Sequence, residues 1–202
     1  MEVITTLLLS LSLLFAHDPL RVLRERYDGI LTLEARFRQR IYMPNLKKER
    51  ELEGRFLYKK GKGFLWRYER PEERLYLFDG SFLWEDYRDR PYVVREQVTE
   101  ERKRGTFFDL IEDIRRLEEF FELEASYGTD TGRTIELLPK KKGALQRVKL
   151  YLDQEGMVRK VEMEEIGGAR NVIEFSSIKE NRPVKDSLFV FDPGTKEVRG
   201  RP

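Results

Sequence analysis

The chain has 202 residues, of which 40% are hydrophobic and 38% charged, and 39 Lys and Arg against 37 Asp and Glu leave a formal net charge of +2. This size and composition predict one folded domain rather than a disordered or fibrous chain, and the near balance of charge disfavours a nucleic-acid-binding protein. The sequence contains no cysteine, which excludes disulfides, thiolate metal sites and cysteine nucleophiles.

The N-terminus begins with an uncharged, leucine-rich run at residues 3–16 (VITTLLLSLSLLFA). This run is shorter than the roughly 20 residues that cross a bilayer, but it matches the apolar region of a secretory signal peptide. We therefore expect a signal peptide at residues 1–16 and a single mature domain at residues 17–202. Glu2 stands where a signal peptide normally has Lys or Arg. A buried N-terminal helix is the alternative interpretation.

The residue types needed for common catalytic sites are nearly missing. His17 is the only histidine, and no G-x-S-x-G segment occurs. We therefore expect no catalytic residues, no metal site and no cofactor, and a protein that is not an enzyme. The low number of Asn and Gln residues, together with many opposite charges, is typical of proteins from heat-adapted organisms.

A first helix is predicted after Asp18-Pro19, which pairs a capping carboxylate with proline at the first helical position. The helix is expected to end at Asp28-Gly29. Its apolar residues recur at spacings of three, four and three, so they lie on one face: Leu20, Leu23, Tyr27 and Ile30.

From Leu31 onward the hydrophobic pattern has a period of two, which is typical of half-buried strands. Turn signals separate the strands, among them the hairpin loop at residues 60–63 and Asp79-Gly80. A second helix is predicted at residues 106–117, after the solvated charged run at residues 99–104. The expected strands cover residues 31–41, 51–59, 64–68, 74–78, 82–85, 92–97, 134–138, 145–152, 157–165, 171–178 and 187–191.

So many short antiparallel strands must curl or close into one domain. The aromatic residues could then form either a solid core or the lining of an apolar cavity, and periodicity does not separate the two. Several carboxylates could in principle act in general acid–base catalysis, but surface ion pairs are the favoured interpretation for all of them: Glu69, Glu72, Glu73, Glu85 and Asp86.

The order and spacing of several segments resemble those of the LolA family of periplasmic lipoprotein carriers. Residues 54–71 (GRFLYKKGKGFLWRYERP) and 77–84 (LFDGSFLW) carry most of this resemblance. Residues 33–39, 106–111 and 189–193 extend it, so that it covers about residues 18–198. The resemblance implies a mainly β protein with helices (α+β), in which a curved antiparallel sheet forms an open, incomplete β-barrel capped by helices.

The function that this resemblance implies is transport of acylated lipoproteins through the periplasm. The cargo would come from an inner-membrane lipoprotein-releasing ABC transporter and pass to an outer-membrane acceptor, carried by a monomer that binds no nucleic acid. Since each methylene group exposed to water costs about 0.8 kcal/mol, such a carrier must shelter the acyl chains in an apolar interior.

Under this hypothesis, aromatic and branched residues line the acyl-chain cavity. The predicted lid side has Leu23, Tyr27, Phe108 and Ile111, and the predicted sheet side has Phe37, Phe56, Phe64, Trp66, Phe82 and Trp84. Each of these side chains would fit equally well in a filled core.

The β-hairpin at the cavity mouth departs from the family pattern. Family members have Arg-Pro where this chain has Lys60-Gly61. The family's arginine helps to close the lid, and lysine lacks its planar fork of donors, so the same closure does not follow. Lys60 is the candidate basic residue that closes the cavity mouth, and Lys59 and Lys62 could share this role. The alternative is that Lys60 is only an exposed lysine of the hairpin.

Two other functions remain open from the sequence. The first is a periplasmic lipid- or glycolipid-binding or sensor module on the same fold. The second is a carboxylate-based hydrolase, which would require two acidic side chains to face a polar cleft.

Overall fold

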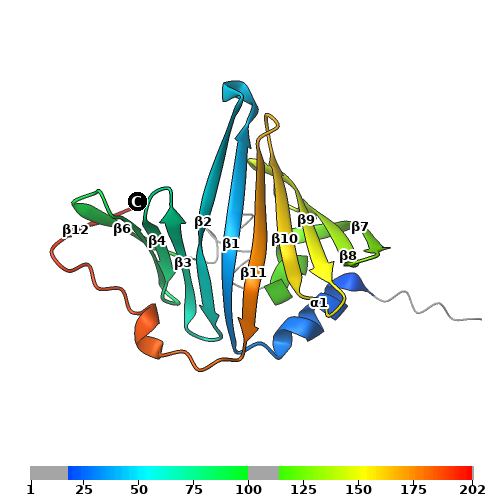
Figure 1. The fold of residues 1–202 in the computed structure, drawn as a ribbon, viewed down its shortest axis with the longest axis horizontal. Coiled ribbons are helices and arrows are strands. Elements are labelled where there is room, and N and C mark those ends of the chain that lie inside the picture. Colours follow the sequence, from blue (N-terminus) through cyan, green and yellow to red (C-terminus); the bar gives the residue numbers. More distant parts are fainter. Residues whose placement is uncertain (1–17, 100–113, 202) are drawn as a thin grey trace, which may run out of the picture.

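The computed structural model describes residues 18–99 and 114–201, and its strands form one twelve-stranded sheet (Figure 1). The helices are α1 (Pro19–Asp28) and α3 (Leu117–Phe120), and the 3₁₀ turns are η1 (Pro44–Leu46), η2 (Ile114–Arg116) and η3 (Asp186–Phe189). The strands are β1 (Thr32–Met43), β2 (Lys48–Lys59), β3 (Gly63–Arg70), β4 (Arg74–Phe78), β5 (Phe82–Tyr87), β6 (Tyr92–Gln97), β7 (Phe121–Thr129), β8 (Gly132–Pro139), β9 (Leu145–Asp153), β10 (Val158–Glu165), β11 (Arg170–Glu180) and β12 (Glu197–Gly200).

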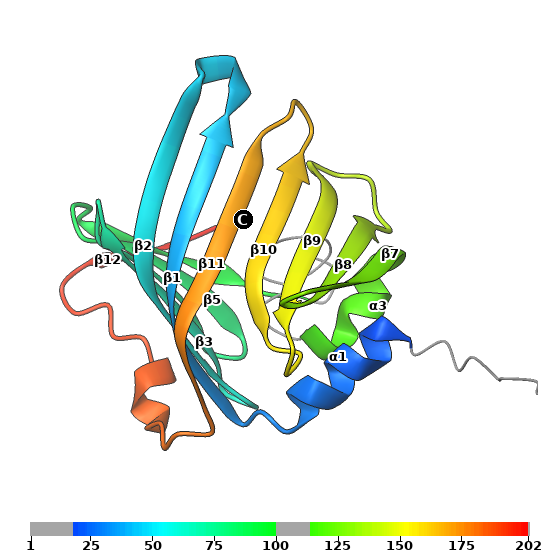
Figure 2. The same ribbon diagram turned by 45° about the vertical axis from the view of Figure 1, so that its right-hand side comes forward.

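The sheet runs in the order β12-β6-β5-β4-β3-β2-β1-β11-β10-β9-β8-β7, so β1 lies in its middle. Consecutive hairpins lead from β1 to β6 on one side and from β7 to β11 on the other. All neighbours are antiparallel except β12, which pairs in parallel with β6. In Figures 1 and 2 the long strands β1, β2 and β11 form the front of the sheet, and β3 to β6 bend behind them. Since β12 and β7 do not pair in the described part of the chain, the sheet is open, as predicted.

The alternating pattern of β1 explains why this strand has two different faces. Ala35, Phe37 and Gln39 are buried, whereas Arg36 and Arg38 between them are exposed. We call the face that carries Phe37 the inner face and the opposite one the outer face. The central hydrophobic cluster of the protein lies on the inner face.

Helix α1 begins and ends as predicted from the sequence. The carboxylate of Asp18 accepts a hydrogen bond from the backbone N–H of Leu20 at 3.0 Å, and Pro19 occupies the first helical position. Leu20 and Leu23 are buried in the same hydrophobic cluster as the sheet residues. α1 lies beside η2 and α3 below strands β8 to β10 (Figures 1 and 2), where the Arg24 guanidinium pairs with the Glu118 carboxylate at 2.9 Å.

Three features differ from the sequence-based expectations. The predicted strand at residues 187–191 is wrong, because the chain forms η3 there and buries only the side chain of Phe189 from that turn. Strand β7 was not predicted, although its apolar residues alternate with polar ones, and among its residues only Phe121 is buried. β12 was not predicted either, since all four of its residues are exposed and show no apolar pattern.

Two predicted segments fall on residues that the structure does not describe. The signal peptide at residues 1–16 lies outside the described residues, and so does most of the helix predicted at residues 106–117, whose described end is η2 and Leu117. In residues 18–99 and 114–201, no helix combines the length and the hydropathy needed to cross a membrane.

Candidate functional site

A cluster of aromatic side chains occupies the inner face where β1, β2, β3 and β11 meet. The Phe37 ring stacks on the Trp66 indole with centroids 4.0 Å apart, and the Tyr68 ring meets Phe37 edge-on at 5.3 Å. Phe56 lies directly opposite Trp66 in the β2–β3 register, and Phe175 lies opposite Phe37 in the β1–β11 register. We call these five residues the aromatic cluster. Phe37, Phe56 and Trp66 have at most 5% of their surface exposed.

The aromatic side chains continue toward the hairpin between β2 and β3. Phe64, the second residue of β3, lies opposite Phe78 in the β3–β4 register, with ring centroids 5.7 Å apart. From α1, Leu23 is 1% exposed and belongs to the same connected set of buried residues. The structure thus brings together Leu23, Phe37, Phe56, Phe64 and Trp66 from the set proposed from the sequence.

Tyr27 of α1 packs against this hydrophobic set and is anchored to the turn between β9 and β10. Its hydroxyl donates to the Met157 sulfur at 3.1 Å and accepts from the backbone N–H of Val158 at 3.1 Å. Burial of the hydroxyl raises the pKa of Tyr27 to about 12, although the hydrogen bond from Val158 acts in the opposite direction. The ring itself is half-buried.

Phe82 and Trp84 do not lie with the aromatic cluster. Trp84 is opposite Leu77 in the β4–β5 register, whereas Phe78, the partner of Phe64, is opposite Leu83. Because side chains alternate between the faces of a strand, Phe82 and Trp84 belong to the outer face. There Trp84 stacks on Phe191 with centroids 4.7 Å apart. Phe82 and Trp84 therefore do not belong to the candidate site, contrary to the prediction. Phe108 and Ile111 lie outside the described residues.

The hairpin between β2 and β3 connects two other elements through its lysines. The Lys60 ammonium is exposed and donates to the backbone carbonyl of Asp28 at the end of α1 at 3.2 Å. Lys59 and Lys62 instead pair with the Asp186 carboxylate of η3 at 2.7 and 2.9 Å. These two lysines lower the pKa of Asp186 to about 2.

Polar side chains interrupt the inner face near the upper ends of its strands. The Tyr68 hydroxyl donates to the Gln39 carbonyl oxygen at 2.7 Å, and the Gln39 amide donates to Asn171 of β11 at 2.9 Å. Arg74 of β4 lies beside Tyr68, and the Glu85 carboxylate of β5 lies opposite Tyr76 on the same face. The sequence analysis missed Arg74. It could have been found only from the β3–β4 register, which places Arg74 opposite Tyr68.

All five candidate carboxylates form ion pairs. For four of them the pair lies at the surface, as predicted. Glu85 differs, because its side chain is 12% exposed and lies on the inner face. Its two oxygens accept from Tyr76, Tyr87 and Arg201. The four outer ion pairs are Glu69–Arg55, Glu72–Arg50, Glu73–Arg88 and Asp86–Lys196.

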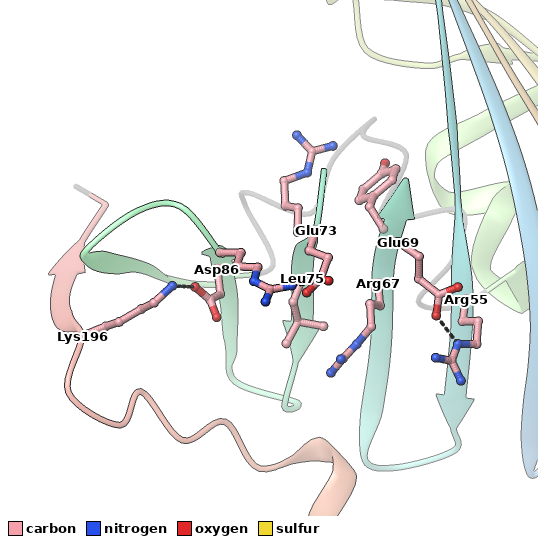
Figure 3. A pocket seen from close by; sticks show the side chains of 10 residues that line it. Arg55, Arg67, Glu69, Glu73, Leu75, Asp86 and Lys196 are labelled. Carbon is pink, nitrogen blue, oxygen red and sulfur yellow. Dashed lines mark hydrogen bonds and ion pairs between the residues drawn. The ribbon is translucent and has the colours of Figure 1, made fainter. Parts of the chain in front are cut away.

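Two hollows at the surface of the described residues are lined largely by charged side chains. One groove of about 500 Å³ lies over β2 to β5, with Arg67 and Leu75 on its floor and the Asp86–Lys196 ion pair at one side (Figure 3). Another of about 480 Å³ includes Arg40, Glu49 and Arg170. Neither lining suits an acyl chain. Within the described ranges no three His, Cys, Asp or Glu residues are grouped so as to hold a metal ion.

Comparison with known proteins supports the implied family. The family profile described as "Outer membrane lipoprotein carrier protein LolA" matches residues 28–192. An outer-membrane lipoprotein carrier protein of Xanthomonas campestris pv. campestris (strain B100) is 27% identical over 188 residues, which cover 90% of this chain and 89% of the relative. The protein of the same name from Nitrosospira multiformis is 25% identical over 172 residues, or 85% and 83% of the two chains.

Among solved structures, an uncharacterized conserved protein from Thermus thermophilus has a similar fold. The TM-score is 0.59 at 12% sequence identity, and the match covers 92% of this chain and 99% of the other. At this level of identity the similarity concerns the fold alone.

Proposed function

The chain belongs to the LolA family of outer membrane lipoprotein carrier proteins, and we propose that it binds the acyl chains of lipoproteins on its inner face and carries them through water. The transport needs no covalent chemistry, which agrees with a sequence that has one histidine and no cysteine. We further propose that the carrier works in the periplasm, after removal of residues 1–16. It would receive cargo from an inner-membrane ABC transporter and deliver it to an outer-membrane acceptor.

The observation that carries the proposal is the aromatic cluster on one face of an open sheet. An acyl chain of a dozen methylene groups costs about 10 kcal/mol to expose to water. The inner face offers side chains that can take up this apolar surface, because Phe56, Trp66 and Phe175 come from three different strands and meet on that face. The charged grooves elsewhere on the protein offer no comparable surface.

Helix α1 is well placed to act as a movable cover over this face. It contributes Leu20 and Leu23 to the hydrophobic cluster, and polar contacts connect its C-terminal end to the sheet and the hairpin, among them the Tyr27 hydroxyl, Arg26 with Glu180, and Lys60 with the Asp28 carbonyl. We propose that binding of an acyl chain replaces part of the packing between α1 and the sheet. Lys60 would then influence how readily the cover opens and the cargo leaves.

A matched pair of variants tests whether the acyl chain lies on the inner face. Leu83 and Leu65 are both half-buried leucines, and they lie on opposite faces of the sheet, with Leu83 opposite Phe78 and Leu65 opposite Leu77. We expect Leu83→Glu to weaken binding of a fluorescent fatty-acyl probe at least tenfold, since a carboxylate on the apolar face opposes burial of the chain. Leu65→Glu should leave the affinity of the probe within twofold of the unaltered protein.

Two results would count against the proposal. If the unaltered protein does not bind the acyl probe, or if both variants bind it equally well, the inner face is only a packed core. Mass spectrometry of protein purified from its own periplasm gives an independent check, because a carrier should retain lipid or acylated peptide. The identity of that lipid also separates a lipoprotein carrier from a glycolipid carrier or sensor on the same fold.

A further inference from the structure

The inner face changes from apolar to polar along β4 and β5. At the lower end of these strands Phe78 is paired with Leu83, and one step up Tyr76 is paired with Glu85. At the upper end Arg74 is paired with Tyr87. The sheet therefore offers hydrocarbon contacts at one end of the strands and hydrogen-bonding groups at the other.

Arg74 is surrounded by tyrosine rings. The carbon atom at the centre of its guanidinium group lies 4.3 Å from the ring centroid of Tyr68, 5.0 Å from that of Tyr76 and 5.3 Å from that of Tyr87. Such cation–π contacts partly replace the water that a guanidinium loses on burial. They leave the planar donors of Arg74 available in the plane of the group.

The hydrogen-bonding capacity of Arg74 is not used up. Its Nη1 donates to the Tyr87 hydroxyl at 3.3 Å, but its Nε is buried and has no hydrogen-bond partner in the described part of the chain. No carboxylate of the described residues lies within ion-pair distance of Arg74. Leaving a buried donor unsatisfied normally costs about 1–3 kcal/mol, and more for a charged group.

The nearest acid of this cluster is already engaged by other donors. One Glu85 oxygen accepts from the Tyr76 and Tyr87 hydroxyls at 3.1 and 2.7 Å, and the other accepts from Arg201 at 3.0 Å. Arg74 is thus linked to Glu85 only through the Tyr87 hydroxyl. This arrangement fixes the tyrosines in place and leaves Arg74 Nε without an acceptor in the described part of the chain.

Open space adjoins this cluster. Tyr68 and Arg74 also line the groove of about 500 Å³ that is drawn in Figure 3. The floor of this groove, Arg67 and Leu75, belongs to the outer face, so the groove reaches Arg74 only at its edge. A polar group of a ligand beside Arg74 would stay near water there, while the rest of the ligand follows the inner face of the strands toward Phe64 and Phe78.

We propose that Arg74, held by Tyr68, Tyr76 and Tyr87, is a subsite for the oxygen-bearing end of the acyl cargo. This inference rests on the proposed function and adds an orientation to it. The hydrocarbon chain lies toward Phe64 and Phe78, and an oxygen acceptor of the cargo receives a hydrogen bond from Arg74 Nε. An ester carbonyl and a free carboxylate both supply such an oxygen, and the experiment below separates them.

The test compares three ligands with the same chain length: an alkane, the methyl ester and the free fatty acid, each competing with a fluorescent acyl probe. We expect the ester and the acid to bind the unaltered protein about tenfold or more tightly than the alkane, a ratio typical of a hydrogen bond to a charged group. If the ester and the acid bind equally well, a carbonyl oxygen is sufficient for recognition by Arg74. If the acid binds more tightly, the subsite recognises a carboxylate.

Arg74→Met should lower the affinity for the ester and the acid to that for the alkane, and leave the alkane unchanged. Arg74→Lys keeps the charge but has no Nε donor in the same place, so it should lose the preference for the ester and retain part of that for the acid. Arg36→Met is the matched control, because Arg36 is exposed on the outer face of β1 and does not line the groove beside Arg74. It should bind all three ligands as the unaltered protein does.

The outcomes separate the two proposals. If the unaltered protein binds none of the three ligands, the proposed carrier function fails. If it binds the alkane as tightly as the ester and the acid, the subsite is wrong and the carrier remains. An equal loss of affinity for all three ligands in both Arg74 variants would show that Arg74 only supports the fold. If Arg74→Met does not fold, Arg74→Lys tests the subsite in the same way, by its affinity for the ester and the acid relative to the alkane.

Discussion

The ring of Phe37 lies against the indole of Trp66 across the backbone of β2, with the two planes 24° from parallel. This contact is possible because Gly54 is opposite Phe37 in the β1–β2 register and has no side chain to separate the rings. A Cβ atom at Gly54 would lie 2.7 Å from the tip of the Phe37 ring and 1.9 Å from the backbone oxygen of Arg67.

We therefore predict that Gly54→Ala lowers the free energy of unfolding by about 3 kcal/mol or more, at or beyond the upper end for overpacked cores. Gly128→Ala is the control, since a Cβ atom there meets nothing within 4 Å. Urea unfolding followed by tryptophan fluorescence measures both. Equal stability of the two variants would contradict the close packing of Phe37 over β2.

Trp66→Ala should destabilise the protein by about 3–5 kcal/mol, the usual cost of truncating a fully buried aromatic residue. Trp66 is 1% exposed and contacts Phe37, Phe56 and Phe175. Trp84→Ala should cost less, since Trp84 is half-buried on the outer face. The same unfolding experiment compares the two tryptophans. A larger loss for Trp84 would contradict the assignment of the inner face as the core.

Tyr27→Phe should lower stability at pH 7 by about 1–3 kcal/mol, because it removes the hydroxyl that satisfies the buried N–H of Val158. The pKa of Tyr27 is raised to about 12 in the folded protein, so the neutral phenol favours folding below about pH 10. That contribution is lost as the pH rises from about 10 to 12. The difference in unfolding free energy between the two proteins should therefore shrink over this interval, and a constant difference would refute the raised pKa.

The Asp186 carboxyl should titrate near pH 2, since Lys59 and Lys62 both hold its charged form. A lowered pKa means that the interaction is fully present above about pH 4 and is lost as the pH falls toward 2. Carboxyl NMR titration measures the value directly. In a Lys59→Met, Lys62→Met double variant the pKa should return to about 3.9. The same value in both proteins would show that the lysines do not contact Asp186 in solution.

Lys60→Leu should change the unfolding free energy by no more than about 0.5 kcal/mol, because Lys60 is exposed and its ammonium makes a surface hydrogen bond to the Asp28 carbonyl. Under the proposed function it should change the rate at which bound acyl probe is released, since that contact connects the hairpin to α1. Stopped-flow transfer of the probe to vesicles measures the rate. An unchanged release rate would leave Lys60 with no role beyond the turn.

Local patterns were sufficient to predict most of the fold. The capped helix at Pro19–Asp28 and the alternating strands each carry their signal within a few residues, so they could be located from the sequence. β12 could not, because its four exposed residues become a strand only by pairing with β6, about a hundred residues earlier in the chain. Residues 187–191 form a short apolar run (SLFVF) that was interpreted as a strand, yet the chain forms η3 there.

The candidate site was harder to predict for a related reason. Alternation gives two faces to each strand, but the register across each turn decides which faces coincide. The turn after Pro71 pairs Tyr68 with Arg74, and this places Phe78 and Glu85, rather than Phe82 and Trp84, beside the aromatic residues of β3. No pattern within β5 carries that information, so the two outward aromatic residues were assigned with the others and Arg74 was overlooked.

Among the strands that the structure describes, β7 and β12 do not pair, and this open arrangement has a mechanical consequence. In a closed barrel the number of strands and their stagger set the radius, so the volume inside is fixed. A sheet with two edge strands is under no such constraint. Small changes in strand twist can therefore widen or narrow the enclosed space while the hydrogen bonds between neighbouring strands are kept. Under the proposed function, the protein could therefore accommodate acyl chains of different size and release them while every pair of neighbouring strands stays hydrogen-bonded.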